Sequence, residues 1–136
     1  MANELYAKGK QGLIDGSIDL DTDTIKAVLA DGADYTPNMS TDDNLDDIPE
    51  AARVAISGAL ANKSVTDGVF DADDVVVPSV SGDQFEYAIL FKDTGTPSTS
   101  RLILLMDTGS GLPCTPNGGD ITLQWADTAD KIFRLT

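Results

Sequence analysis

The chain has 136 residues, 41% of them hydrophobic, and this length suits one domain with its own core better than two. Nine basic residues stand against 23 acidic ones, so the formal net charge is −14, which opposes binding to nucleic acid or to an anionic membrane surface. The absence of histidine and the single cysteine, Cys114, exclude cysteine–histidine catalysis, histidine-ligated zinc and an internal disulfide.

The N-terminal segment, residues 1–16, is predicted to form an arm or a short helix ahead of a β-domain over residues 17–136. Gly16 would end such a helix, whereas two internal glycines weaken it. The segment has no hydrophobic run of the kind found in secretory signals, so we expect synthesis in a cytosol-like compartment. The apolar stripe expected on one side of the helix consists of Leu5, Tyr6, Leu13 and Ile14.

Eight short segments carry the alternating or continuous apolar runs of β-strands, with turn sequences such as Asp67-Gly68 between them. Residues 49–63 are ambiguous, because Pro49 followed by Glu-Ala-Ala also suits a helix start, and we favour a strand. The spacing predicts an all-β fold, a single antiparallel β-sandwich or barrel-like domain. The expected strands are 24–30, 49–63, 64–70, 74–80, 85–92, 101–106, 120–125 and 131–135, and residues 35–47 are expected to be loop with one helical turn near 44–48.

The sequence Asp-Thr-Gly occurs twice, beginning at Asp93 and at Asp107, and resembles the motif of aspartic proteases. That chemistry needs two aspartates that share a proton. Two aspartates at neighbouring turns, 14 residues apart, lack the separation of a two-lobed protease. We therefore interpret both motifs as Asx-type turns and predict no enzyme. An acid hydrolase that uses Asp93 or Asp107 is kept as an alternative.

Aspartates also gather in groups that invite comparison with metal sites. The spacing Asp19-x-Asp21-x-Asp23 opens like a calcium loop, but Thr24 and Ala30 stand where glycine and glutamate are required. Two further groups, at 42–47 and 71–74, would hold a divalent cation only if they converged in space. We interpret all of them as solvated turn and cap residues and predict neither metal nor cofactor.

A resemblance to a known family is carried by several blocks of sequence, spread over nearly the whole chain, and not by any single motif. In this order they resemble a family of small structural proteins from the virions of tailed bacteriophages. The blocks are Met1-Ala-Asn-Glu-Leu-Tyr6, Thr24-Ile-Lys-Ala-Val-Leu-Ala-Asp31, Asp47-Ile-Pro49 with Arg53-Val-Ala55, Gly68-Val-Phe-Asp-Ala-Asp73, Lys92-Asp-Thr-Gly95, Gly111-Leu-Pro113, Thr115-Pro-Asn-Gly-Gly-Asp-Ile-Thr122 and Lys131-Ile-Phe133.

The resemblance implies a virion structural protein without catalytic residues. Its leading form is a capsid decoration (cement) protein, a homotrimer that binds the major capsid protein on the outside of the assembled head and stabilises it. A tail, head-to-tail connector or fibre-knob component with a receptor- or glycan-facing surface is the alternative. The mildly basic N-terminal segment is the expected contact, through Leu5, Tyr6, Lys8 and Lys10, unless it is a frayed terminus or a lid over one end of the domain.

Overall fold

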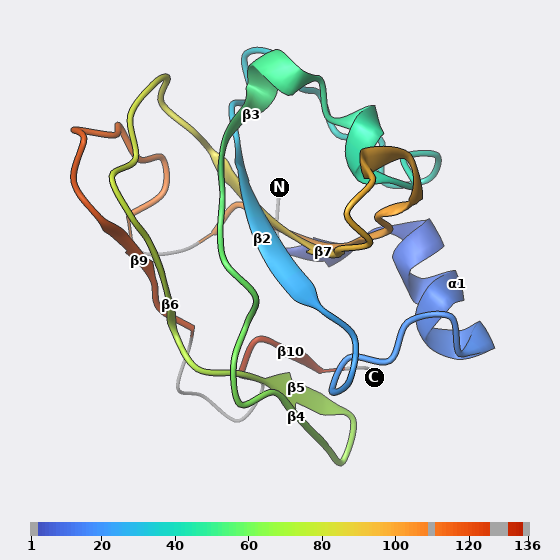
Figure 1. The fold of residues 1–136 in the computed structure, drawn as a ribbon. Helices are drawn as coiled ribbons and strands as arrows, with labels where there is room; N and C mark the ends of the chain where they lie inside the picture. Colours follow the sequence, from blue (N-terminus) through green and yellow to red (C-terminus); the bar gives the residue numbers. More distant parts are fainter. Residues whose placement is uncertain (1–2, 109–110, 126–130, 135–136) are drawn as a thin grey trace.

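The computed structural model describes residues 3–108, 111–125 and 131–134. This described part holds one α-helix, three 3-10 turns and ten β-strands, which form three antiparallel sheets (Figure 1). The prediction of a mainly β fold is confirmed. The barrel-like alternative is wrong, because the largest sheet is open: β1 and β3 are its two edges and do not pair with each other.

The five-stranded sheet forms the centre of the fold and has the order β1-β8-β7-β2-β3. Strands β2 and β7 pair along their whole lengths, from Ile25 opposite Lys92 to Ala30 opposite Tyr87. The three inner strands are covered on both faces, which explains why they read as nearly continuous apolar runs. The bounds are β1 Glu4–Leu5, β2 Ile25–Ala30, β3 Arg53–Ile56, β7 Tyr87–Lys92 and β8 Leu102–Met106.

Two smaller sheets contain the remaining strands, in the orders β10-β5-β4 and β6-β9. The predicted strand 64–70 is in fact a hairpin of two strands. Asp67 and Gly68 both have positive φ, 53° and 78°, as a two-residue type I′ turn requires. The bounds are β4 Ser64–Thr66, β5 Val69–Asp71, β6 Val75–Val77, β9 Ile121–Leu123 and β10 Phe133–Arg134.

Within the described residues, helical structure is confined to short pieces. The alternative of a short N-terminal helix is confirmed by α1, Ala7–Asp15, which ends at Gly16 in the left-handed conformation. The ambiguous segment 49–63 contains both predicted features, because a 3-10 turn, η2 (Glu50–Ala52), leads directly into β3. The helical turn expected near 44–48 is η1, Leu45–Asp47, and η3 is Pro97–Thr99. No helix within the described residues has the length and apolar character needed to cross a membrane.

The core lies on both faces of the five-stranded sheet. Alternate residues of β2 point to opposite faces, so Ala27 and Leu29 join one apolar cluster while Val28 and Ala30 join another. The first cluster also contains residues of the two small sheets, such as Phe70 and Val77. The second is covered by Tyr6, Tyr35, Leu45, Ile48 and Ala52, which come from the N-terminal segment, the long loop and the 3-10 turns.

Candidate functional site

The N-terminal segment was the predicted contact region, and from Glu4 onward it is part of the fold. Leu5 lies in β1 opposite Leu104 and is half-buried. Tyr6 is fully buried, and its backbone N–H donates to the carbonyl of Ile103 at 2.9 Å. Of the four predicted contact residues, Tyr6 therefore has no surface to offer, whereas the two lysines lie on α1, Lys8 half-buried and Lys10 exposed.

A chain of hydrogen bonds fixes Tyr6 in the core. Its hydroxyl lies 2.9 Å from that of Tyr35, which in turn donates to Oδ2 of Asp42 at 2.7 Å. Since the single proton of Tyr35 goes to Asp42, Tyr6 is the donor in the tyrosine pair. Burial is the main cause that raises the pKa of both hydroxyls, so both stay protonated at neutral pH. Tyr6 is thus held in the core by a buried polar network.

Helix α1 packs closely through its glycines, and of the expected apolar stripe Leu5, Tyr6 and Leu13 contact the core whereas Ile14 does not. A Cβ on Gly9 would lie 2.7 Å from the carbonyl oxygen of Leu102 and 2.8 Å from that of Ile103, so the helix backbone rests directly on β8. Gly12 meets the side chain of Ile18 in the same way. Ile14 was expected on the buried side, but its side chain is 84% exposed. That part of the prediction is wrong, because the close approach places the glycine side of the helix inward.

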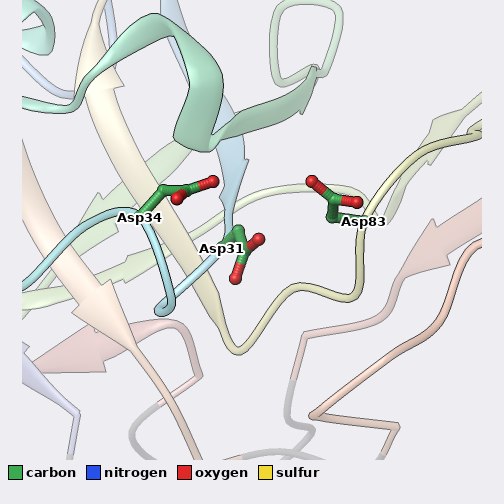
Figure 2. Close-up of side chains that lie close together, drawn as sticks. All are labelled: Asp31, Asp34 and Asp83. Carbon is green, nitrogen blue, oxygen red and sulfur yellow. The ribbon is translucent and has the colours of Figure 1, made fainter.

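Three aspartates from two separate loops converge at another place, which Figure 2 shows in close-up. Asp31 follows β2 and is buried, Asp34 lies three residues further on, and Asp83 precedes β7. Each offers one carboxylate oxygen, and these oxygens all lie within 4.8 Å of one another, with the carboxylates of Asp34 and Asp83 facing each other. No sequence pattern indicates this group, because Asp83 is distant in the chain from Asp31 and Asp34.

Oxygen clusters of this kind suit calcium or magnesium in chemical type. Backbone hydrogen bonds nevertheless account for part of the arrangement, since Oδ1 of Asp31 accepts the N–H of Ala33 at 2.8 Å in an Asx turn. The second group, Asp43, Asp46 and Asp47, lies within the predicted run 42–47. There, Oδ2 of Asp47 accepts the N–H of Asp43 at 2.7 Å. Both groups thus include carboxylates that serve as turn caps.

Asp93 and Asp107, the first residues of the two Asp-Thr-Gly motifs, lie at opposite ends of the sheet. Asp93 follows β7 and Asp107 follows β8, and these strands are antiparallel neighbours. The two carboxylates therefore cannot share a proton in the manner of an aspartic protease. Asp93 accepts the N–H of Gly95 at 3.0 Å, as expected for an Asx turn, and pairs with Lys26 at 2.8 Å. The hydrogen bond from Lys26 is the main cause that lowers the pKa of Asp93.

An apolar hollow of about 530 Å³ lies beside β9 and the ends of β7 and β8. Cys114 lines it and is half-buried, and its backbone pairs with that of Phe85. Trp125, also in the wall, donates its indole N–H to the carbonyl of Asp73 at 2.9 Å. The lining also includes Lys131 and the apolar side chains of Leu112, Ile121 and Leu123.

No protein-family model matches the chain, and no curated protein matches it either. The relation to phage virion proteins therefore stays a prediction from the sequence blocks. A functional assignment has to rest on those blocks and on the surface that the fold presents.

Proposed function

We propose that the protein is a structural component of a tailed-phage virion, and specifically a capsid decoration protein. In this role it binds the major capsid protein on the outside of the assembled head and stabilises the shell. The observation that carries the proposal is the ordered series of sequence blocks from Met1–Tyr6 to Lys131–Phe133, which runs over nearly the whole chain.

The positions of these blocks support the proposal. The block from Thr24 to Asp31 contains the central strand β2, and the block from Gly68 to Asp73 contains β5. The block from Lys92 to Gly95 contains the Asx turn that ends β7. A resemblance concentrated on a central strand and on turns concerns residues that determine the fold, so it favours a shared architecture. We propose a sandwich for that architecture, with the five-stranded sheet facing the two small sheets across the larger core cluster.

The surface chemistry suits a protein that stays dispersed until it meets a preformed shell. Aspartates such as Asp67, Asp83 and Asp120 lie exposed in the turns between strands, and the net charge of −14 keeps separate molecules apart. The edge strand β1 is only two residues long, which leaves little backbone for unintended pairing. We propose a homotrimer for the bound form, because three copies can meet around a local threefold axis of a head.

Copy number in the particle tests this proposal against a tail, connector or fibre-knob role. Quantitative mass spectrometry of purified virions would give the ratio of this chain to the major capsid protein. A ratio near one is expected for a decoration protein that covers the shell. A ratio at least about tenfold lower, as for a tail component, would overturn the assignment to the head.

A further inference from the structure

We infer that the outward side of α1 is the surface that contacts the head, and that it fits a protein surface with an apolar hollow rimmed by carboxylates. We call this surface the outer face of α1 and define it as Ala7, Lys10, Gln11 and Ile14, with Lys8 at its edge. The inference rests on the proposed function and names the contact surface, which keeps Lys8 and Lys10 from the predicted residues but leaves out Leu5 and Tyr6.

Helical spacing brings these residues together. Residues 7, 11 and 14 follow the i, i+4, i+7 pattern of one helix side, opposite Gly9, which rests on β8, and Gly12, which contacts Ile18. Lys8 and Lys10 fall on the two flanks of this stripe. Ala7, Lys10, Gln11 and Ile14 are all exposed, and Lys8 is half-buried.

Lys8 and Lys10 are the basic side chains that have no partner among the described residues. Among the residues that the structure describes, the ammonium groups of Lys8 and Lys10 make no hydrogen bond or ion pair, although the backbone carbonyl of Lys8 accepts a bond from Arg101. The other seven of the nine basic residues have interactions. They are Lys26, Arg53, Lys63, Lys92, Arg101, Lys131 and Arg134.

Ile14 supplies the apolar part of the surface. At 84% exposure it is far more accessible than the other large exposed hydrophobic residues of the described chain, of which Val76 at 50% comes next. A branched side chain that projects from a helix between two cations can insert into an apolar hollow. The flanking lysines then favour carboxylates around that hollow, by charge complementarity.

The helix presents this surface rigidly. Gly9 places the helix backbone against β8, and Tyr6, the residue that precedes the helix, is buried in the core. In addition, Nη1 of Arg101 donates to the carbonyl of Lys8 at 2.9 Å. A surface that is already ordered before binding loses little conformational entropy on docking. Nucleic acid and anionic membranes fit less well, because two lysines cannot offset the repulsion from a chain of net charge −14.

The test uses heads purified from phage particles that lack this protein, with the purified chain added back and the bound fraction measured by sedimentation. The variants are Ile14→Asp and Lys10→Glu. Val65→Asp is the matched control, because Val65 is 49% exposed on β4 in a different sheet and receives the same new charge. Thermal unfolding of each variant confirms that it folds.

We expect Ile14→Asp and Lys10→Glu each to weaken binding at least about tenfold, and Val65→Asp to bind within about twofold of the wild type. Raising the salt concentration should weaken the wild type more than Lys10→Glu, because the lysine contribution is screened. If the wild type binds heads and both α1 variants bind equally well, the inferred surface is wrong while the proposed function stands. If the wild type itself does not bind heads, the proposed function fails, and the inference fails with it.

Discussion

The hydroxyl groups of Tyr6 and Tyr35 lie 2.9 Å apart in the core, and this contact joins the N-terminal segment to the loop that follows β2. Tyr35 in turn donates a hydrogen bond to Oδ2 of Asp42, which also accepts the N–H of Asn38. Tyr6 is thereby tied to the acidic loop over one face of the main sheet. Truncation of this segment would open the core, so point variants are the proper probes of its surface.

The tyrosine network predicts an order of destabilisation. Tyr35→Phe removes the bond to Asp42 and leaves the buried hydroxyl of Tyr6 without an acceptor, which should cost about 1–3 kcal/mol. Tyr6→Phe removes one donor and should cost only about 0.5–1.5 kcal/mol. Urea unfolding followed by circular dichroism measures both values. A larger loss for Tyr6→Phe than for Tyr35→Phe would contradict the assigned direction of the bonds.

The glycine contact between α1 and β8 predicts an unusual effect of alanine. In an exposed helix position, Gly→Ala stabilises by roughly 1 kcal/mol. At Gly9 the added methyl would meet the backbone of Leu102 and Ile103, so we expect a loss of about 2 kcal/mol or more. Gly58→Ala is the control, since its Cβ would have no neighbour within 4 Å. Equal or improved stability of Gly9→Ala would show that the helix does not pack as described.

The pair of Lys26 and Asp93 predicts a dependence of stability on pH. The pKa of Asp93 is lower in the folded chain than in the unfolded one, mainly because of the hydrogen bond from Lys26. The contribution of this pair to the free energy of unfolding is therefore complete above about pH 4. It is lost as the pH falls through the lowered pKa that Asp93 has in the folded chain. Asp93→Asn should cost less than about 1 kcal/mol at pH 7 and less still near pH 3. A stability difference that stays constant over this range would contradict the assignment.

The converging aspartates predict little response to calcium. Carboxylates of both groups already cap backbone N–H groups, as Asp31 does for Ala33 and Asp47 for Asp43. We expect the Tm in EDTA and in millimolar calcium to agree within about 1 °C, because a ligand that binds only the folded state would raise it. A rise of about 4 °C or more that is lost in Asp83→Asn would identify the cluster of Figure 2 as a cation site.

Strand positions could be predicted from the sequence, because periodicity and turn chemistry are local signals. Each of the eight expected segments contains a strand, and the turn at Asp67-Gly68 was recognised even though the predicted segment ran through it. The pairing order is not local. That β2 lies between β3 and β7 follows from contacts between residues far apart in the chain.

The outer face of α1 could be predicted only in part, because burial and exposure also depend on residues far apart in the chain. Lys8 and Lys10 stood out by charge, but the burial of Tyr6 depends on Tyr35, 29 residues away. The exposure of Ile14 depends on Gly9, which appears in the sequence as a helix-weakening residue and in the structure as the contact with β8. Small residues inside a short helix next to an expected strand are the signal that could have reversed the assignment of the two helix sides.

A cryo-EM reconstruction of the intact virion tests the central claim most directly. The account predicts density for this chain on the outer surface of the head, repeated over the shell, with α1 turned toward the major capsid protein and the acidic turns toward solvent. Density confined to the tail, the connector or a fibre tip, with none on the head surface, would contradict it.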